Sequence, residues 1–187
     1  MGLSFNIAFA QTCPTTSPLG TARNFALLGG STITNIGNSA VVGDIGVSPG
    51  STITGMGSLT HTGTLYLAEA VANQAQADTT TFYNALAALP FDLDLSGIDL
   101  GGLVLTPGVY RFSSSAQLTG TLTLNTLGDP NAQFVFQIGS TLTTASGSSV
   151  NVIGGPDDNI FWQVGSSATL GTTTALQGSV LALASVT

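Results

Sequence analysis

Carboxylates and imidazoles build most catalytic and metal sites, and this chain has few of them. Asp92, Asp94 and Asp99 lie close together in the sequence. Grouped carboxylates can serve as the acid and base of glycoside hydrolysis, or can bind calcium. However, Asp92 and Asp94 alternate with leucines, as outward side chains of an exposed strand do, and no glycine-bearing calcium loop with a closing glutamate follows. We expect a solvated strand edge here, with calcium binding as the alternative.

The other reactive side chains are isolated. His61 is the only histidine, so it offers neither a metal cluster nor a triad, and we expect a solvated loop residue. The pair Asp157-Asp158 follows Gly-Gly-Pro and reads as a turn. A polysaccharide lyase would need a base near its acids, yet Arg23 and Arg111 lie away from such a cluster. The sequence therefore predicts no catalytic residues, no metal and no cofactor.

The composition limits the partners. Only 6% of the residues are charged and the net charge is −7, so nucleic acid is excluded for lack of a basic patch. Apolar residues make up 43% of the chain, which is enough for a packed core and argues against disorder. Thr, Ser, Asn, Gln and Gly must cover the surface. Such a surface suits a neutral partner or stacking on itself.

The N-terminus resembles a secretory leader. Residues 1–10 end in Ala8-Phe9-Ala10, an Ala-x-Ala cleavage site after a short apolar run. We expect the remnant of a signal peptide and a secreted, possibly cell-surface, domain over residues 11–187. A disordered N-terminus is the alternative. No other apolar run could cross a bilayer, so we expect no membrane insertion. Cys13 is alone, which excludes an internal disulfide and a thiol-based metal site.

An internal repeat organises the C-terminal half. Residues 109–119, 135–145 and 161–171 align without gaps at a spacing of 26 residues. Each segment alternates with period two, and a small pair such as Gly139-Ser140 divides it into two short strands. A strand, a corner and a second strand, repeated at a fixed spacing, are typical of one turn of a β-helix. Leu122 and Leu124, or Val150 and Val152, supply the third face.

Parity assigns the side chains to the two sides of each strand. The inward columns are Tyr110/Phe136/Trp162, Phe112/Ile138/Val164, Ala116/Leu142/Ala168 and Leu118/Thr144/Leu170. The outward columns beside the last two are Ser115/Thr141/Ser167, Gln117/Thr143/Thr169 and Thr119/Ala145/Gly171. These outward residues are small or hydroxylated and uncharged, and they stack at a spacing of roughly 4.8 Å.

One apolar column, Val109/Val135/Phe161, points away from the core and needs a cover. Residues 65–89 are rich in alanine, carry apolar residues at spacings of three and four, and end at Pro90. The spacing predicts a helix about 37 Å long that packs along a solenoid of six or seven turns and buries this column. An independent helical arm is the alternative.

The strand pattern recurs before this helix. Residues 31–34 and 51–54 both read Ser-Thr-Ile-Thr and echo residues 140–143. Each places one apolar residue between two outward threonines, namely Thr32 and Thr34, or Thr52 and Thr54. Because strands and helix are interleaved without a linker, we expect one domain.

Five blocks of this sequence resemble the microbial ice-binding protein family known as DUF3494. They are residues 19–28, 43–50, 105–110, 128–137 and 161–166, in the family's order. The resemblance implies a mainly β fold, a discontinuous right-handed three-faced β-solenoid with one long flanking helix, which binds ice through one flat face. Family members are secreted and inhibit ice growth and recrystallisation. They usually continue for another turn, so we expect residues 181–187 to precede a truncation.

Some members of this family carry a Thr-Ala/Gly-x-Thr/Asn motif on the ice face. Thr21-Ala22-Arg23-Asn24 fits this motif but lies outside the repeat, and residues 144–147 only approach it. Short, stiff, uncharged side chains suit ice, because threonine restricts χ1 and charged groups keep their own hydration. We therefore expect a monomer that contacts an ice crystal surface through Ser115, Gln117, Thr119, Thr141, Thr143, Ser167, Thr169, Thr32, Thr34, Thr52 and Thr54. The rivals are a structural or adhesive module of the cell envelope and a polysaccharide-active enzyme.

Overall fold

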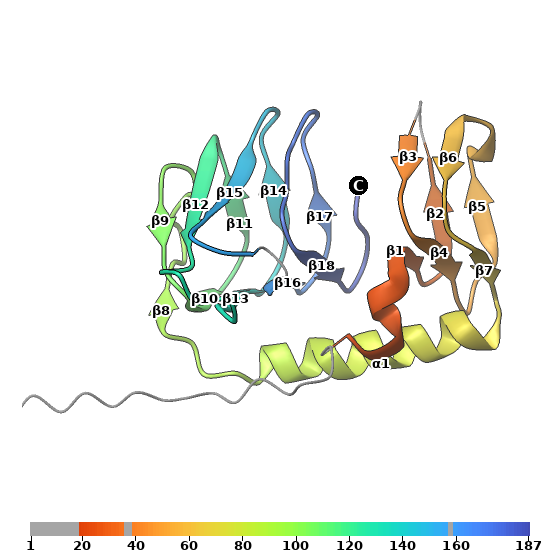
Figure 1. Cartoon of the computed structure of the whole chain (residues 1–187), viewed down its shortest axis with the longest axis horizontal. Helices are drawn as coiled ribbons and strands as arrows, with labels where there is room; N and C mark the ends of the chain where they lie inside the picture. Colours follow the sequence, from red (N-terminus) through yellow and green to blue (C-terminus); the bar gives the residue numbers. More distant parts are fainter. Residues whose placement is uncertain (1–18, 36–38, 157–158) are drawn as a thin grey trace, which may run out of the picture. The chain divides into compact units, whose positions relative to one another are not determined.

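The computed structural model describes residues 19–35, 39–156 and 159–187 (Figure 1). The expectations for residues 1–10, Cys13 and the Asp157-Asp158 turn lie outside these ranges. The described chain is mainly β, with one α-helix, α1 (Ala70–Ala87). It forms two compact units, Met1–Asp78 and Thr79–Thr187, and the boundary falls inside α1. The single domain expected from the sequence stays a prediction.

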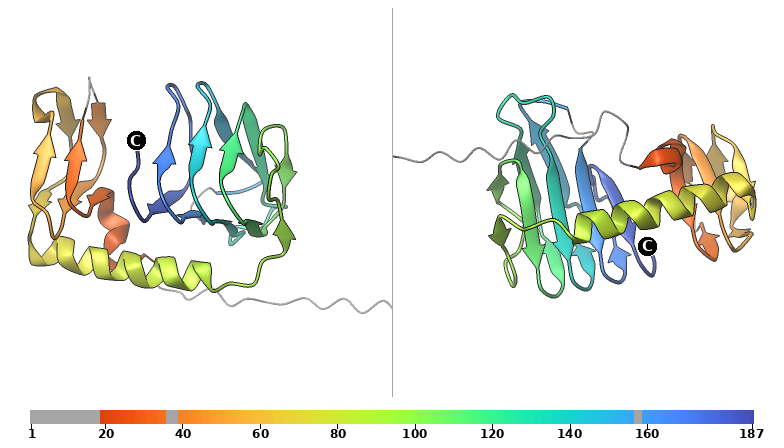
Figure 2. Two further views of the ribbon diagram at one scale, coloured as in Figure 1. Left: turned by 180° about the vertical axis from the view of Figure 1, so that it is seen from behind. Right: turned by 90° about the horizontal axis from the view of Figure 1, so that it is seen from below.

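The second unit is built from three parallel sheets, with strand orders β18-β16-β13-β10-β8, β11-β14-β17 and β15-β12-β9 (Figures 1 and 2). Consecutive strands from β10 to β15 visit the three sheets in turn. The strands are β8 (Leu93–Asp94), β9 (Val104–Leu105), β10 (Gly108–Phe112), β11 (Ala116–Leu118), β12 (Thr121–Asn125), β13 (Phe134–Ile138), β14 (Leu142–Thr144), β15 (Ser149–Ile153), β16 (Ile160–Val164), β17 (Ala168–Thr169) and β18 (Ser179–Ala182).

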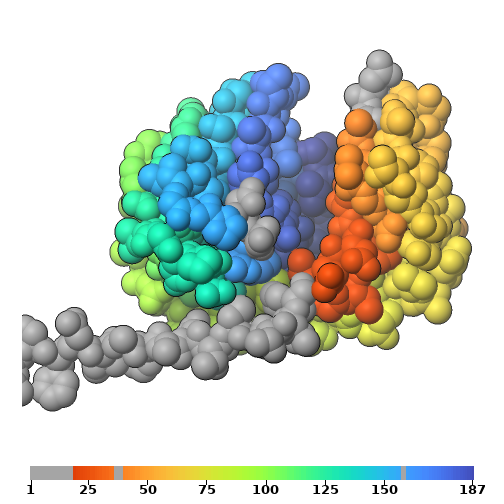
Figure 3. All heavy atoms as spheres, viewed as in Figure 1, coloured from red at the N-terminus to blue at the C-terminus, as the bar shows by residue number. Residues whose placement is uncertain are grey.

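The strand register confirms the 26-residue repeat. Val135 lies beside Val109 and Phe161, and Leu142 lies beside Ala116 and Ala168. In the third sheet, the paired strands β12 and β15 place Leu122 beside Val150 and Leu124 beside Val152. Figure 3 shows the result on the surface of this unit, where bands of residues follow one another in chain order. Residues at equivalent positions of the repeat therefore stack directly.

The core of the second unit is formed by the inward columns predicted from parity. All of their side chains are buried except Leu170, which follows the end of β17 and is half-buried. Tyr110, Phe136 and Trp162 stack, with ring centroids 5.5 Å and 4.0 Å apart. The Trp162 Nε1 group donates a hydrogen bond to the Gln177 carbonyl (2.9 Å), so the polar atom of this buried indole has a partner.

The helix is shorter than the sequence suggests. It spans Ala70–Ala87, and Leu65–Leu67 instead forms strand β7. This apolar triplet pairs in parallel with β4 (Asp44–Val47), so sheet pairing overrides the helical spacing of Leu65. Ala68 then adopts a positive φ of 54°, which separates the strand from the helix. The predicted start at residue 65 was wrong by five residues.

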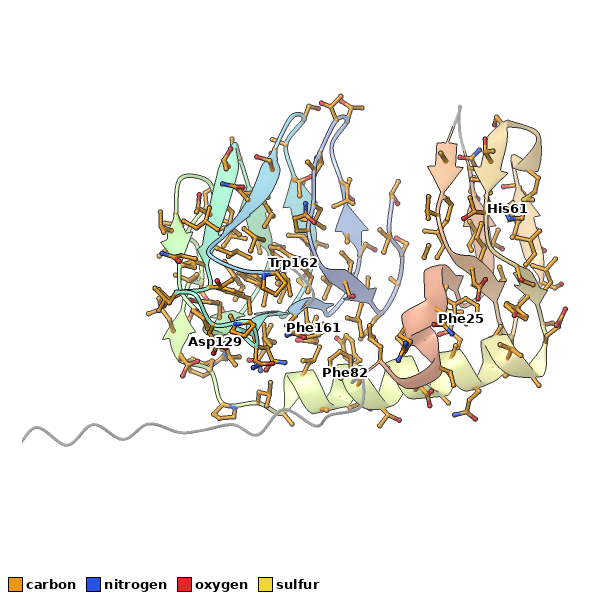
Figure 4. The ribbon with its side chains drawn as sticks, viewed as in Figure 1. Phe25, His61, Phe82, Asp129, Phe161 and Trp162 are labelled. Atoms are coloured by element: carbon orange, nitrogen blue, oxygen red, sulfur yellow. The ribbon has the colours of Figure 1, made fainter. Side chains whose placement is uncertain are left out.

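Within the second unit, the C-terminal part of α1 covers the apolar column. Val109, Val135 and Phe161 are all buried, and the Phe82 ring packs against Phe161 (Figure 4). The Gln137 side-chain amide donates hydrogen bonds of 2.8 Å to the carbonyls of Leu86 and Leu89. Leu86 lies in the last turn of the helix, where intrahelical donors are lacking, and Leu89 follows two residues after the helix ends. The alternative of an independent helical arm was wrong.

The first unit contains three small parallel sheets, β1-β4-β7, β2-β5 and β3-β6. Its other elements are η1 (Gly20–Asn24), β1 (Phe25–Gly29), β2 (Thr32–Thr34), β3 (Ser39–Val41), β5 (Thr52–Thr54), η2 (Met56–Ser58) and β6 (Leu59–His61). Ile45, Val47, Ala72 and Ala75 are fully buried, so the N-terminal part of α1 contributes to this core. His61 ends strand β6 and is half-buried, which corrects the expected loop position.

No helix in the described ranges is long and apolar enough to cross a membrane.

Candidate functional site

An exposed, uncharged column runs across the outward side of the β11-β14-β17 sheet. Gln117, Thr143 and Thr169 occupy consecutive strands in register, and all three are exposed. They alternate with buried residues such as Leu142, because successive side chains of a strand point to opposite faces. The core behind the sheet therefore fixes the direction of this column. We call Gln117, Thr143 and Thr169 the central column.

A second column, Ser115/Thr141/Ser167, lies immediately before the same strands, and its hydroxyls are hydrogen-bonded to hydroxyls of neighbouring turns. The hydroxyls of Ser115 and Thr141 are 2.8 Å apart, and the Ser185 hydroxyl donates to that of Ser167 at 3.1 Å. Thr141 and Ser167 are half-buried, whereas Ser115 is exposed. These hydrogen bonds join side chains on neighbouring turns of the repeat, called rungs here, and fix the spacing of the side chains. We call Ser115, Thr141 and Ser167 the bonded column.

The third outward column, Thr119/Ala145/Gly171, is small. Thr119 is exposed, and its N–H donates to the Asp99 carboxylate at 2.9 Å. A Cβ atom at Gly171 would lie 2.6 Å from the Ser146 nitrogen, so a larger residue does not fit there. The outward side chains are therefore short where the sheet ends, at the corner that leads to β12 and β15.

Buried hydroxyls at this corner were missed by the sequence reasoning. The Thr144 hydroxyl accepts from the Gly171 N–H at 2.9 Å and lies 2.8 Å from the Thr174 hydroxyl. The Ser148 hydroxyl donates to the Leu118 carbonyl at 2.9 Å. The one available signal was Thr144 itself, a polar residue in an otherwise apolar inward column. These bonds satisfy polar groups that burial would otherwise leave without partners.

The first unit repeats the outward threonine pattern on the β2-β5 sheet. Thr32 pairs in register with Thr52, and Thr34 with Thr54. All four side chains are exposed, and the Thr54 hydroxyl donates to that of Thr34 at 3.2 Å. The predicted contact residues therefore fall into two groups. Ser115, Gln117, Thr119, Thr141, Thr143, Ser167 and Thr169 come together at one sheet of the second unit, and the four threonines come together on one sheet of the first.

The motif residues Thr21-Ala22-Arg23-Asn24 lie on no strand. They form the short helix η1, in which Ala22 is buried. The N–H and hydroxyl groups of Thr21 both donate to the Asp78 carboxylate at 2.7 Å. These two bonds, with a third from the Gln74 side chain, hold the pKa of Asp78 below its ordinary value. Thr21 therefore anchors the start of β1 to α1.

The three aspartates that the sequence analysis singled out, Asp92, Asp94 and Asp99, accept hydrogen bonds from backbone N–H groups. The carboxylates of Asp92 and Asp94 accept from the N–H groups of Val109 and Ser96, at 2.8 and 2.9 Å. Asp99 accepts from Gly101 as well as from Thr119. Burial pushes the pKa of Asp99 upward, but these backbone donors outweigh it and the pKa lies below its ordinary value. Asp94 belongs to the edge strand β8, as the alternation with leucines predicted.

Within the described ranges, no three His, Cys, Asp or Glu residues gather closely enough to hold a metal ion. The His61 side chain bonds locally: its Nδ1 atom lies 2.9 Å from the Gly63 carbonyl oxygen. Arg111 stacks over the Phe91 ring, with 4.9 Å from its guanidinium carbon to the ring centroid. Arg111 also lies in register beside Asp94, which corrects the expectation that it lies away from the acidic residues. The repeat, in contrast, stacks uncharged side chains on one sheet.

Two solved structures of ice-binding proteins superpose on this chain. An ice-binding protein from the Antarctic ascomycete Antarctomyces psychrotrophicus superposes with a TM-score of 0.87 at 39% identity, over 90% of this chain and 83% of the other. A second crystal structure, of an ice-binding protein from an Antarctic biological consortium, gives a TM-score of 0.85 at 44% identity, over 96% and 80%.

Curated sequences and a family profile point the same way. The "Ice-binding protein" of Nostoc sp. (strain HG1) is 60% identical over 171 residues, which are 91% of this chain and 64% of that protein. The "Ice-binding protein 1" of Shewanella frigidimarina is 33% identical, over 92% of this chain and 23% of that protein. The chain therefore spans less than two thirds of the length of these relatives. The profile of the family described as Ice-binding-like matches residues 27–187, and the chain belongs to this family.

Proposed function

We propose that this chain binds ice crystals through the outward side of the β11-β14-β17 sheet and thereby inhibits ice growth and recrystallisation. The observation that carries the proposal is the central column. It offers three exposed, uncharged side chains at one repeat position, held in register by parallel pairing over a fully buried core. The names of the relatives, all ice-binding proteins, support it.

The chemistry of this surface suits a rigid, neutral lattice. The β-branch of threonine restricts χ1, so little side-chain entropy remains to be lost on binding. Each threonine also joins an apolar methyl to a hydroxyl that can hold an ordered water. Charged groups would keep their own hydration shells, and the three outward columns contain none. Many weak contacts, fixed in advance by the sheet, can together hold the protein on a crystal.

We further propose that the fold is a discontinuous right-handed β-solenoid with three faces. The support is that consecutive strands visit three parallel sheets in turn, and that relatives at 39% and 44% identity superpose well. We also propose that the β2-β5 sheet of the first unit, which carries Thr32, Thr34, Thr52 and Thr54, contacts ice. The protein acts outside the cell, as a monomer and without catalysis.

Direct observation of ice tests the function. The chain has one cysteine, Cys13, which allows a single fluorescent label. We expect the labelled protein to coat a single ice crystal grown slowly in its solution, while labelled serum albumin stays in the liquid. Exclusion of both proteins from the crystal would contradict the proposal and favour a structural or adhesive module of the cell envelope.

A further inference from the structure

The two hydroxylated columns of the β11-β14-β17 sheet differ in their hydrogen bonding. We infer that they divide the work: the central column makes the hydrogen bonds to ice, and the bonded column sets the rung spacing and contacts ice little. This inference rests on the proposed function, because it assigns roles within the same surface.

The bonded column has already committed hydroxyl groups to its neighbours. In the Ser115–Thr141 pair and in the Ser185–Ser167 pair, one hydroxyl hydrogen points along the stack. A hydroxyl has only one hydrogen to donate. Thr141 and Ser167 are also half-buried, which reduces their access to an outside surface. The donor hydroxyl of each pair would therefore have to break a bond within the protein in order to donate to ice, and the acceptor hydroxyl has one of its two lone pairs occupied.

The central column has made no such commitment. Among the residues that the structure describes, the hydroxyls of Thr143 and Thr169 and the amide of Gln117 have no hydrogen-bond partner. All three side chains are exposed and in register. Their donors and acceptors are free for water, and adjacent rungs repeat them at about 4.8 Å. This column presents a regular array whose order comes from the backbone and from the bonded column beside it.

The first unit shows the same division independently. On the β2-β5 sheet, Thr34 and Thr54 are bonded to each other through their hydroxyls. Thr32 and Thr52 stand opposite each other in register, and no partner for either hydroxyl lies among the described residues. One bonded pair and one free pair on a two-stranded sheet match the two columns of the larger sheet. By the same reasoning, Thr32 and Thr52 contact ice in this unit.

Two double variants test the division. Thr143→Val with Thr169→Val removes the hydroxyls of the central column and keeps the β-branched shape. Ser115→Ala with Thr141→Val removes one bonded pair. For each we would measure the lowest protein concentration that arrests ice recrystallisation, and the melting temperature. Circular dichroism near 0 °C checks that both variants are folded where the ice assay is made.

We expect the two variants to separate the two readouts. Loss of the central hydroxyls should raise the arresting concentration by roughly tenfold or more, since two hydrogen bonds are lost, and leave the melting temperature unchanged. Loss of the bonded pair should lower the melting temperature by about 2–4 °C and change the arresting concentration less than twofold, by a rough estimate.

Equal loss of ice activity in both variants, or a larger loss in the Ser115/Thr141 variant, would overturn the division of roles. So would full ice activity in the Thr143/Thr169 variant. These results are distinct from failure of the proposed function, in which the unmodified chain itself would leave recrystallisation unaffected.

Discussion

Phe82 of α1 meets Phe161 of β16 edge to face, with ring centroids 4.9 Å apart and ring planes at 84°. Both rings are buried, and Phe161 belongs to the apolar column that points away from the core of the second unit. The helix therefore completes the packing of the β18-β16-β13-β10-β8 sheet. Without this cover, the sheet would expose an apolar stripe to water.

Truncation of this contact should destabilise the protein strongly. Phe82→Ala would lose a buried aromatic side chain and leave a cavity beside Phe161, so we expect the free energy of unfolding to fall by about 3–5 kcal/mol. Urea denaturation followed by Trp162 fluorescence measures this change. Asn84→Ala, at an exposed position two residues along the helix, is the matched control and should change stability by less than about 0.5 kcal/mol. Similar values for the two variants would contradict the packing role.

Gln137 ties the end of the same helix to β13. Its amide donates to the carbonyls of Leu86 and Leu89, so Gln137→Glu would set a carboxylate against two acceptors at a helix C-terminus. We expect a loss of about 1–3 kcal/mol at pH 7. Below the ordinary glutamate pKa of about 4.3 the protonated acid can donate one hydrogen bond, so part of the loss should return. A variant whose deficit relative to the parent is the same at pH 3.5 and pH 7 would contradict this role.

Asp99 should make the stability of the protein sensitive to acid. Because its pKa is lowered in the folded state, its contribution to stability is present above the unfolded pKa of about 3.9 and is lost as pH falls through the folded value. In Asp99→Asn the amide oxygen can still accept from Gly101 and Thr119 but does not titrate. We expect the parent to lose more stability than this variant between pH 5 and pH 2, as measured by thermal melts. Parallel pH profiles would show that Asp99 contributes nothing to acid sensitivity.

Much of the fold of the second unit could be predicted from the sequence, because residues at a fixed repeat spacing stack on one another. A spacing of 26 residues placed Val109, Val135 and Phe161 in one column, and parity gave the buried side of each strand. The need to cover that column predicted the helix that packs on it. These inferences depend only on the periodicity of the sequence and on the free-energy cost of exposing apolar side chains to water.

Each error in the sequence-based prediction has a physical cause, a contact with a residue distant in the sequence. The apolar triplet Leu65–Leu67 fits helical spacing as well as strand alternation, and its pairing with β4 decides between them. His61 lies in a strand because β3 and β6 pair beside it, a long-range contact that its polar surroundings in the sequence do not reveal. Thr21 fits a family motif in type and order, but its hydroxyl binds Asp78, which lies 57 residues away.

Hydrogen bonds among surface hydroxyls were beyond the reach of the sequence. Ser115, Thr141, Thr143 and Thr169 are chemically similar residues in neighbouring outward columns. In the folded protein the first two are bonded to each other at 2.8 Å, while the last two have no partner among the described residues. The sequence therefore predicted the outward surface of this sheet as a whole. The hydrogen bonds in the structure divide that surface into a bonded column and a central column.

The most direct test of the central claim is thermal hysteresis of the purified chain beside two tyrosine variants. Thr143→Tyr places a bulky ring in the middle of the central column, and Asn151→Tyr places the same ring at an exposed position in the middle of β15, on a different sheet. We predict hysteresis in the parent and in Asn151→Tyr, and its loss in a folded Thr143→Tyr. Hysteresis retained in Thr143→Tyr and lost in Asn151→Tyr, or absent from all three folded proteins, would contradict the assignment of ice binding to the β11-β14-β17 sheet.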